Sequence, residues 1–503
     1  MKKTSYILLI AAGLLALAGC KDFLKEEPFL TQSNALALSD YNNLNKAVAG
    51  AYGPLVDGAW YGAGYVLDAE MRADNATIPI SSDFQSGRGQ GPFNMNYSLD
   101  SAPGLWGYGY YVISAVNNVL EEIETNGIDA YTSSAVSEQD MKNLQAECLF
   151  LRALAHFDML RLYAYSPAKT GVANFTDGIP IILKTDKTAK EQPARNSVTE
   201  VYDQIIADLL EAETLMDPSY KRSGVADAKA AATLPAIQAL LSRAYLYDQK
   251  WQEAADYATK VINNTSFKLW TADEYPSVWG NETGGSEVIF EVYGRNSNDY
   301  DEYWEGPSHL TNPIGYADYA ASSSLTGLFE AGDVRGTTGV RGTDDGKVMF
   351  CTDPDEASGG ELWTMKYYGK GLGDATSTPD VSNTIVLRLS EMYLNRAEAL
   401  ANGANITGAT ALNDINTIRA NRGASALSAA GPAAIALERR LELNFEGHYW
   451  FDLARSASGS ITYTDSRRKG GDLAADSKYW ALPIPKREYD VNSNLTHNPG
   501  FEK

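Results

Sequence analysis

The sequence predicts an all-α protein built from tetratricopeptide-like helical pairs, with long loop-rich insertions and minor β structure. Two observations predict this class. Several segments repeat apolar residues at spacings of three and four, which places them on one face of a helix, and the stretches between them lack that period but are rich in glycine, asparagine and aromatic residues. The 503 residues, 44% hydrophobic and 21% charged, have a globular composition that excludes disordered, collagen-like and coiled-coil chains.

The first twenty residues have the organisation of a secretory signal. Lys2 and Lys3 precede an apolar run over residues 7–18, which is too short to span a bilayer comfortably. The run ends in Leu-Ala-Gly-Cys20, which resembles the bacterial lipobox, in which cleavage leaves a lipidated cysteine at the new N-terminus. The alternative is an ordinary signal peptide with an incidental cysteine. Because the chain has only 3 cysteines, we predict a signal peptide over residues 1–19 and lipidation of Cys20.

The charge of the chain excludes one class of partner. The formal net charge is −22, and removal of residues 1–19 takes away two lysines and no acid, which gives −24 for the mature chain. Nucleic acid is therefore not an expected partner, since its phosphates would be repelled by this field.

No later segment is expected to cross a membrane. The most apolar one, residues 144–165, is interrupted by four charged residues, and each would cost about 2.5–3.5 kcal/mol at the bilayer centre. We therefore expect anchorage through lipid alone. Cys148 lies in this helical segment and Cys351 lies in a polar loop, and whether the two form a disulfide is left open.

Helical patterns follow in order along the chain. From Met141, apolar residues form one stripe through Leu154. At Ser197, the sequence Ser-Val-Thr-Glu has the spacing of a capping box, which predicts the start of a second helix. Two further helices, at about 228–248 and 251–263, are joined by a turn so short that they must be antiparallel neighbours.

This last pair has the character of a tetratricopeptide repeat. Large side chains alternate with alanines, so the two helices can approach closely while rings fill the remaining gaps. The pattern returns in a helix opened by Ser390 and ended by Gly403, a partner helix over 409–418, and a third helix from Pro432. Glycine just after the last periodic residue is a common helix stop.

Two long stretches have no helical period, although the second contains the strand-like run 287–293. Their density of aromatic rings argues against disorder, so we interpret them as loops packed on the helical scaffold. The expected organisation is one domain over residues 20–503, with a scaffold at about 35–57, 110–263 and 386–455 and a ligand face at about 58–109 and 264–385.

A series of short motifs runs through nearly the whole chain. They are Cys20-Lys21-Asp22-Phe23-Leu24 with Glu27-Pro28, Ala146-Glu147 with Phe150-Leu151-Arg152-Ala153, Ser286-Glu287-Val288-Ile289-Phe290, Arg388-Leu389-Ser390-Glu391-Met392-Tyr393-Leu394, Glu438-Arg439-Arg440-Leu441-Glu442-Leu443, Phe445-Glu446-Gly447-His448, Pro483-Ile484-Pro485 and Asn498-Pro499-Gly500. No single motif is specific, but in this order and spacing the chain resembles the SusD/RagB family of outer-membrane nutrient-binding lipoproteins of Bacteroidetes.

The resemblance implies a SusD-like fold whose irregular face binds oligosaccharide or peptide. It also implies a partner, a SusC-like TonB-dependent transporter on which the lipoprotein sits as a lid. Lys21-Asp22, directly after the lipid cysteine, looks like the short acidic signal that sends lipoproteins of this phylum to the cell surface. In one place the chain departs from the family: Tyr449 follows Gly-His where an arginine is common, which puts any ion pair of that arginine in doubt.

The sequence offers little that suggests catalysis. Glu438 and Glu442 share a helix face and could serve as an acid and a base, but Arg439, Arg440 and Arg455 favour an ion-pair network instead. The 4 histidines are unpaired in sequence, and the acidic segments 344–345 and 353–356 with Glu361 lack EF-hand spacing. Whether calcium binds there is left open. Phosphate-loop, dinucleotide and serine-elbow motifs are missing, so no cofactor is expected.

Aromatic clusters in the loop-rich stretches are the candidate ligand site. Sugars present apolar C–H faces ringed by hydroxyl groups, so a site needs flat rings beside hydrogen-bonding side chains. The alternative for any one ring is a local mini-core. Clusters also occur at residues 106–111 and 363–368, but the predicted ligand-binding residues are Trp60, Tyr61, Tyr65, Arg72, Asp74, Asn75, Tyr293, Arg295, Asn296, Tyr303 and Trp304.

Taken together, these features predict a non-enzymatic surface lipoprotein that captures a neutral or weakly acidic oligosaccharide for a transporter. A strongly sulfated or uronate-rich glycan would require Arg72, Arg88, Arg295 or Arg341 to gather into a basic pocket. Three alternatives remain open: a RagB-like peptide binder, a secreted glycoside hydrolase, and a helical scaffold that binds only protein. A hydrolase would need two carboxylates about 5–9.5 Å apart across a cleft.

Overall fold

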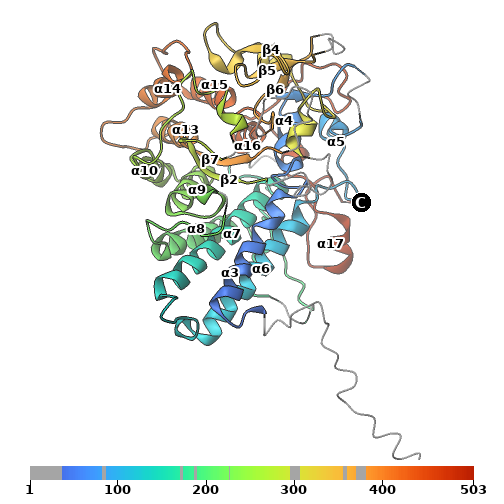
Figure 1. Cartoon of the computed structure of the whole chain (residues 1–503). Helices are drawn as coiled ribbons and strands as arrows, with labels where there is room; N and C mark the ends of the chain where they lie inside the picture. Colours follow the sequence, from blue (N-terminus) through green and yellow to red (C-terminus); the bar gives the residue numbers. More distant parts are fainter. Residues whose placement is uncertain are drawn as a thin grey trace, which may run out of the picture.

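The computed structural model describes residues 37–81, 86–169, 174–185, 188, 190–225, 227–281, 283–294, 306–354, 360–369 and 381–502. Within these residues the chain is mostly helical, with short strands in the upper half of Figure 1. The predicted all-α class is confirmed. No helix among the described residues combines the length and the apolar character that crossing a bilayer requires.

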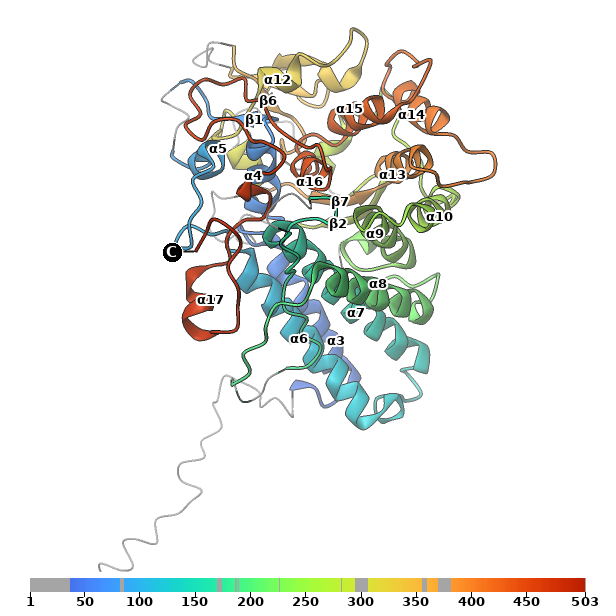
Figure 2. The ribbon, with the colours of Figure 1, turned by 180° about the vertical axis from the view of Figure 1, so that it is seen from behind.

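Four helices lie side by side in the lower half of the molecule (Figures 1 and 2). They are α3 (Tyr41–Ala51), α6 (Leu105–Asn126), α7 (Glu138–Tyr163) and α8 (Val198–Leu215). Helix α7 packs against the other three and is buried almost all round from Met141 onward. It begins in a capping box formed by Ser137 and Asp140, and the capping box predicted at Ser197 and Glu200 is present at the start of α8.

The predicted helical pairs form a second stack. Helices α9 (Leu234–Tyr247) and α10 (Trp251–Ile262) approach closely enough for the Ser242 hydroxyl to donate to the Ala254 carbonyl at 3.0 Å. Helix α13 packs on α10 and is followed by α14 and α15, which pack on α13. The bounds are α13 (Leu389–Ala401), α14 (Ala411–Ala420), α15 (Pro432–Glu442), α16 (Tyr449–Ala454) and α17 (Lys486–Val491).

The two loop-rich segments contain more regular structure than expected. The first holds α4 (Gly64–Arg72), α5 (Gln90–Asn94) and β1 (Ala76–Thr77). Seven of the nine residues of α4 are buried, and they include the charged residues Glu70 and Arg72. The second holds β2 (Val288–Val292), α11 (Pro307–Leu310), β3 (Ala320–Ala321), α12 (Ser323–Thr326), β4 (Thr338–Val340), β5 (Phe350–Thr352), β6 (Trp363–Thr364) and β7 (Thr384–Arg388). Short 3-10 turns cover Gly53–Val56, Ile128–Ala130, Ala228–Ala230, Val278–Gly280, Val334–Gly336 and Lys478–Trp480.

The strands pair across long sequence distances. Strand β1 pairs antiparallel with β3, so that Ala76 faces Ala321, and this pairing joins the two loop-rich segments. Strand β2 pairs antiparallel with β7, and β5 pairs parallel with β4 and antiparallel with β6. The strand expected at 287–293 is therefore present as β2.

One principal hydrophobic core runs through the described residues from Leu44 to Leu495. A small satellite cluster lies between α13, α14 and α15. The C-terminal segment returns to the middle of the molecule: the Leu482 amide donates to the Leu162 carbonyl at 2.9 Å, and Asn498 Nδ2 donates to the Tyr163 carbonyl at 2.8 Å. The end of the chain therefore completes the environment of α7.

Cys148 and Cys351 are both buried and free. Cys148 lies within α7 and Cys351 lies within β5, so the disulfide that the sequence left open is not formed. Burial raises the pKa of the Cys351 thiol to about 12, and it raises that of Cys148 as well, so both side chains act as small apolar groups.

Candidate ligand-binding site

The two loop-rich segments meet at a cavity of about 440 Å³, which we call the loop-face cavity. The β1–β3 pairing brings the segments together, and Figure 2 shows β1, β6 and α12 near one another at the top of the molecule. A third segment, residues 464–467, completes the wall. The lining residues are Thr77, Ile80, Ala321, Ser322, Ser323, Thr326, Gly360, Glu361, Leu362, Thr464, Asp465, Ser466 and Arg467.

Hydroxyl side chains dominate this lining. Six of the thirteen residues are serine or threonine, and no aromatic residue is among them. Ile80, with 72% of its surface exposed, supplies an apolar contact at the cavity. Such a surface offers many donors and acceptors to a hydroxyl-rich ligand and little to an apolar one.

Asp465 and Arg467 form a fixed ion pair in the cavity wall. Arg467 Nη2 lies 2.6 Å from Asp465 Oδ2, and the same nitrogen donates to the Ile78 carbonyl at 2.7 Å. The Thr77 hydroxyl also donates to Asp465 Oδ2, at 2.7 Å. Burial by itself would raise the pKa of Asp465, but the hydrogen bonds from Arg467 and Thr77 lower this pKa to about 2.

Glu361 presents an unused acceptor. Its Oε1 atom accepts from the Ile80 amide at 2.6 Å, whereas its Oε2 atom is buried with no hydrogen-bond partner among the described residues. Burial raises the pKa of this carboxyl group. A buried acceptor without a partner is costly, and a donor from a ligand would relieve that cost.

The predicted ring cluster Trp60, Tyr61 and Tyr65 is interior, with each residue 4% exposed or less. The indole N–H of Trp60 and the two tyrosine hydroxyls all donate to the carboxylate of Asp158, at 2.8, 2.6 and 3.0 Å. These rings show no face to solvent, so their assignment as ligand contacts is corrected: the polar tips that suggested a wet surface instead hold a buried carboxylate. The three rings instead form a local mini-core, which was the alternative considered for them.

Arg72, Asp74 and Asn75 are also buried, but two of them lie directly behind the cavity. Asp74 Oδ2 accepts from the Thr464 hydroxyl at 3.3 Å, and the Asp74 carbonyl accepts from the Ser322 hydroxyl. Asn75 Oδ1 instead accepts from Arg440 Nε at 2.8 Å. Asp74 and Asn75 therefore lie beside the cavity, and Asp74 positions lining residues rather than lining the cavity itself.

Arg72 and Tyr293 lie elsewhere. The Arg72 guanidinium stacks 5.0 Å from the Trp450 ring and donates to the Tyr97 hydroxyl at 2.9 Å, so it is committed to the interior. Tyr293 lines a separate cavity of about 480 Å³ between α3, the 224–230 segment and β2. The remaining predicted residues, Cys20, Arg295, Asn296, Tyr303 and Trp304, lie outside the described residues.

Several lining residues were missed in the sequence. Residues 464–467 read Thr-Asp-Ser-Arg in a polar stretch with no periodicity, and nothing local distinguishes them from other loop residues. Glu361 was considered only as a calcium ligand. A signal was present in its position near Trp363, inside an aromatic cluster of the predicted ligand face.

The buried pair Glu438 and Glu442 is confirmed as an ion-pair network. Glu442 lies 2.7 Å from Arg422 and 2.6 Å from Arg388, and burial is outweighed by these arginines, which hold the pKa of Glu442 well below its usual range. A carboxylate so stabilised is a poor proton carrier.

The predicted partners in that network were wrong. Arg439 pairs with Asp452 at 3.2 Å, and Arg440 stacks 4.4 Å from the Tyr449 ring. The arginine partners of Glu442 are Arg388 at the end of β7, Arg422 just after α14, and Arg335 in the 3-10 turn Val334–Gly336 at 3.1 Å. All three are distant in sequence and therefore outside any helix-spacing rule. Tyr449 thus contacts an arginine of α15 at the position where the family commonly has its own arginine.

The described residues contain no group of three or more His, Cys, Asp or Glu side chains arranged to hold a metal ion. Two of the acidic residues considered for calcium are engaged within the protein: Asp344 Oδ2 accepts from the Val340 amide at 3.0 Å, and Asp345 pairs with Arg341.

Comparison with known protein families gives one match in each half of the chain. Residues 22–246 match a family model described as "Starch-binding associating with outer membrane", and residues 340–501 match the model of the "SusD family". The "SusD-like protein P2" of Formosa agariphila is 25% identical over the full length of both chains.

Solved structures share the fold. A SusD superfamily protein from Bacteroides vulgatus has a TM-score of 0.78 and 26% identity, and the alignment covers 92% of this chain and 100% of that one. A "Putative sugar binding protein" from the same species has a TM-score of 0.77 and 26% identity, over 92% and 99% of the two chains.

Proposed function

The chain belongs to the SusD/RagB family, and from that premise we propose that it is a cell-surface lipoprotein that captures neutral oligosaccharides and delivers them to a SusC-like TonB-dependent transporter. A structure of similar fold is described as a putative sugar binding protein, which supports the ligand class. The binding site is the loop-face cavity.

One observation carries the ligand assignment: the lining of that cavity is built from hydroxyl groups around one fixed ion pair and one carboxyl oxygen without a partner. A sugar hydroxyl can donate to Glu361 Oε2 and to the oxygens of the lining threonines and serines. Four of these residues, Thr77, Ser322, Thr326 and Thr464, already donate their own hydroxyl hydrogen within the protein and so offer an acceptor oxygen. Ile80 offers an apolar contact for the C–H face of the same sugar.

The charges favour a neutral ligand. The cavity holds two carboxyl groups and one guanidinium, so it has no excess positive charge for sulfate or uronate groups. Three of the four arginines considered above for a basic pocket are engaged within the protein. Arg72 and Arg341 are buried, and Arg88 stacks 4.1 Å from the Tyr316 ring.

A glycoside hydrolase is the second candidate, because Glu361 and Asp465 share the cavity and their pKa values are displaced in opposite directions. A nucleophile or base, however, needs a free carboxylate oxygen. Both oxygens of Asp465 already accept hydrogen bonds from Arg467, and one accepts from Thr77 as well. This occupancy favours binding over catalysis.

The test is a binding screen of the purified mature chain against neutral oligosaccharides, acidic glycans and peptide mixtures by calorimetry and affinity gels. We expect a neutral glycan to bind, and Glu361→Gln to weaken it at least about tenfold, since one hydrogen bond to a charged group contributes about 1.5–3 kcal/mol. Glu253→Gln, at an exposed site on α10, is the matched control and should leave affinity unchanged.

Three outcomes would overturn the proposal. Tight peptide binding without any glycan response would favour the RagB-like alternative, and release of reducing ends that is lost in Glu361→Gln would favour the hydrolase. If no small ligand raises the melting temperature, the protein-only scaffold remains, because a ligand that binds the native state stabilises it.

The proposed lipid anchor implies a membrane-spanning partner protein. A lipid-anchored binder cannot carry cargo across the membrane by itself, so import requires a spanning protein, and the family resemblance supports a SusC-like transporter in that role. Co-purification of a barrel-sized companion from detergent-solubilised outer membranes is the expected result. A chain that stays monomeric under mild extraction would count against this partnership.

A further inference from the structure

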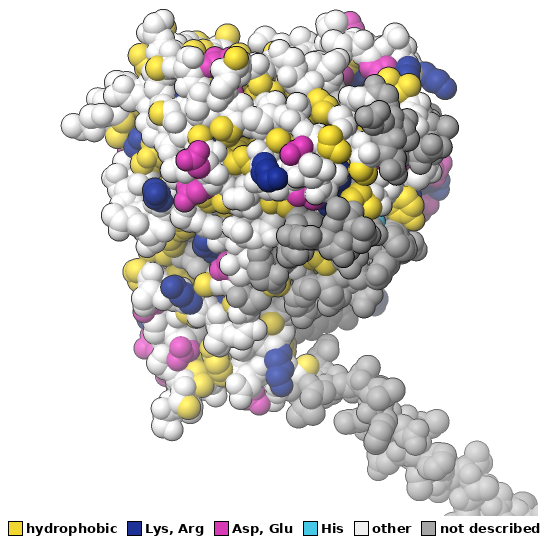
Figure 3. All heavy atoms as spheres, turned by 45° about the horizontal axis from the view of Figure 1, so that its top comes forward, with side chains coloured by type: hydrophobic (Ala, Val, Ile, Leu, Met, Phe, Trp, Pro, Cys, Tyr) yellow, Lys and Arg dark blue, Asp and Glu magenta, His cyan; other side chains and the backbone are white. Residues whose placement is uncertain are grey.

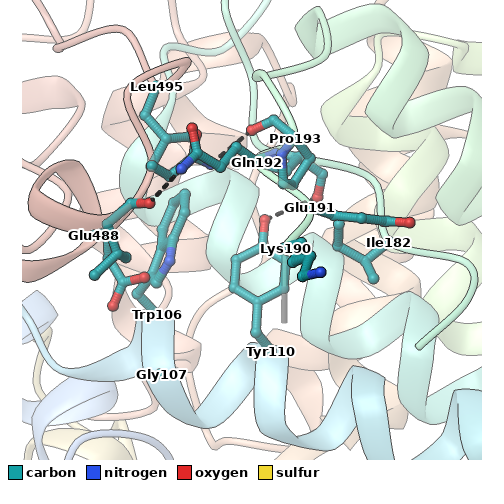
Figure 4. A pocket seen from close by; sticks show the side chains of 13 residues that line it. Trp106, Gly107, Tyr110, Ile182, Lys190, Glu191, Gln192, Pro193, Glu488 and Leu495 are labelled. Atoms are coloured by element: carbon teal, nitrogen blue, oxygen red, sulfur yellow. Dashed lines mark hydrogen bonds between the residues drawn. The ribbon is translucent and has the colours of Figure 1, made fainter. Parts of the chain in front are cut away.

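A second cavity, of about 690 Å³, lies between the N-terminal half of α6, residues 180–182 and 190–193, and the region of α17. We call it the α6–α17 cavity; Figure 4 shows it from close by. It lies away from the loop-face cavity, because both ribbon views place α6 and α17 in the lower half of the molecule and β6 in the upper half (Figures 1 and 2). Two of its lining residues, Trp106 and Tyr110, belong to the aromatic cluster at residues 106–111, which was not among the predicted ligand-binding residues.

Three hydrogen bonds tie the walls together. The Tyr110 hydroxyl donates to the Pro180 carbonyl at 2.8 Å, Gln192 Nε2 donates to the Val491 carbonyl at 2.9 Å, and Asn492 Nδ2 donates to the Pro193 carbonyl at 2.9 Å. These bonds join α6 to Pro180, and join Gln192 and Pro193 to the end of α17, as the dashed lines of Figure 4 show. The cavity is therefore held open by its own frame before any ligand arrives.

One part of the cavity is apolar and aromatic. Trp106 and Tyr110 rise side by side from α6 toward the cavity, with ring centroids 5.0 Å apart (Figure 4). Pro180, Ile182 and Leu495 contribute further apolar surface. Val491, which also lines the cavity, has 69% of its surface exposed. An exposed apolar side chain in the lining can contact a ligand directly.

The remaining lining is polar and balanced in charge. It consists of Lys190, Glu191, Gln192, Glu488 and Asn492. Arg487 lies over the same helix face: a Cβ atom added at Gly107 would lie 2.5 Å from Arg487 Nη2. With two basic and two acidic groups around it, the cavity selects for neither sign of charge.

From this arrangement we propose that the α6–α17 cavity is a second carbohydrate site, which takes a short stretch of neutral pyranose rings. The inference rests on the proposed function and deepens it. A pyranose has apolar C–H faces for the Tyr110 and Val491 side and hydroxyl edges for the amide and carboxylate groups opposite. The volume lies within the range of about 300–1,000 Å³ that is usual for small-ligand sites.

Two sites on one chain have a consequence for long glycans. A short oligosaccharide fills each cavity independently, whereas a chain long enough to reach both binds the second cavity as an intramolecular step. The effective concentration of that step raises the apparent affinity by about 10²–10⁴-fold without any new contact. Long polysaccharide chains would then be retained in preference to their short fragments.

Calorimetry on the mature chain tests the proposal with defined probes: maltose and maltohexaose, cellobiose and cellohexaose, mannobiose and mannohexaose. For the series that binds, we expect two disaccharide molecules per chain. Glu361→Gln in the loop-face cavity should leave the second event intact. Hydrogen exchange should slow on sugar addition in residues 180–185, 190–193 and 486–495 as well as around the loop-face cavity.

Two variants address the α6–α17 cavity directly. Ile182→Trp fills the cavity while leaving the backbone bonds of its frame in place, and Tyr110→Ala removes an aromatic wall. Each should reduce the number of disaccharide molecules bound per chain from two to one. Each should also weaken binding of a polysaccharide of the same series at least tenfold. Tyr111→Ala, at the neighbouring exposed tyrosine, is the matched control for loss of a ring from α6 and should keep both binding events. Tyr110→Ala also removes a structural hydrogen bond. If that variant fails to fold, Ile182→Trp alone tests the cavity.

The outcomes separate this inference from the proposed function. One binding event per chain, lost in Glu361→Gln and untouched by Ile182→Trp, overturns the second site while the function stands. Absence of any glycan binding overturns both. Protection of residues 180–185 and 190–193 by a peptide, and not by any sugar, overturns the carbohydrate assignment of this cavity.

Discussion

At the scale of single residues, Asp158 lies at the centre of a buried hydrogen-bond network. Its carboxylate accepts from the indole of Trp60, the hydroxyls of Tyr61 and Tyr65, and the guanidinium of Arg161, the last at 2.6 Å. The residue has no solvent exposure, so these four donors replace the water that the charge loses on burial. One α7 residue therefore fixes the path of the chain that enters α4.

Asp158→Asn should be strongly destabilising. The amide keeps the shape of the side chain but leaves Arg161 as a buried cation without its partner, which typically costs about 3–5 kcal/mol. Chemical denaturation of the purified chain measures this as a lowered free energy of unfolding. Asp129→Asn, at an exposed position, is the matched control. A loss below about 0.5 kcal/mol would show that the network adapts to a neutral centre.

Glu291 makes stability depend on pH. Burial raises its pKa to about 7; a hydrogen bond from the Gly284 amide at 3.0 Å and nearby Lys229 act in the opposite direction, while Asp227 adds to the increase. The unfolded chain ionises this group near pH 4.5. Between those values the folded state holds a proton that the unfolded state has released, so stability falls as the pH rises toward 7.

Glu291→Gln should remove that dependence. At pH 5 the variant and the parent should be similarly stable, and at pH 8 the variant should be more stable by about 2–3 kcal/mol, since one pKa unit corresponds to about 1.4 kcal/mol. Denaturation midpoints at the two pH values give the comparison, with exposed Glu211→Gln as the control. Parallel pH profiles for parent and Glu291→Gln would contradict this assignment.

At the scale of elements, the capping box of α8 is the most local device in the fold. The Glu200 amide donates to the Ser197 hydroxyl at 3.2 Å, and the Ser197 amide donates back to the Glu200 carboxylate at 2.8 Å. Ser197→Ala should therefore lower the free energy of unfolding by about 1 kcal/mol. Thr199→Ala, two residues further on an exposed position, should change it by less than half as much. Equal effects would mean that the cap contributes nothing beyond helix propensity.

The elements that the sequence predicted share one property: the residues that predict each of them lie close together in the chain. Helices α9, α10, α13 and α15 carry stripes and stops within a dozen residues, and the α8 cap needs four. Helix α4 was missed because it is only nine residues long and two of its three charged residues, Glu70 and Arg72, are buried, so its charges do not mark a side that faces solvent. Strands of two residues, such as β1 and β3, have no periodicity of their own and exist only through pairing.

The candidate site was less predictable for the same reason. Its lining comes from residues 77–80, 321–326, 360–362 and 464–467, which meet only after folding. Aromatic density located the surrounding region, but rings such as Trp60 are attracted to buried carboxylates as readily as to sugars. Composition could not separate the two roles, because each needs an apolar ring with a polar tip.

At the scale of the whole molecule, the N-terminal cysteine is expected to decide where the protein resides. Cys20→Ser should move the protein from the membrane fraction to the soluble fraction, since two or more acyl chains are needed for stable anchoring and the described helices supply no span. Detergent phase partition measures the shift. Cys351→Ser, at a buried free thiol, should not alter partition. Retention of Cys20→Ser in the membrane pellet would instead indicate anchorage by a partner protein.

The return of the C-terminal segment to α7 has a consequence for the timing of folding. The Tyr163 carbonyl accepts from Asn498, a residue 335 positions later in the chain. Closing so long a loop carries an entropic cost of about 5 kcal/mol that only the completed contacts offset. Contacts of such high sequence separation make folding slow relative to helix formation. In a chain that emerges from a narrow channel N-terminus first, the contacts between α7 and the C-terminal segment therefore form only after Asn498 has come through.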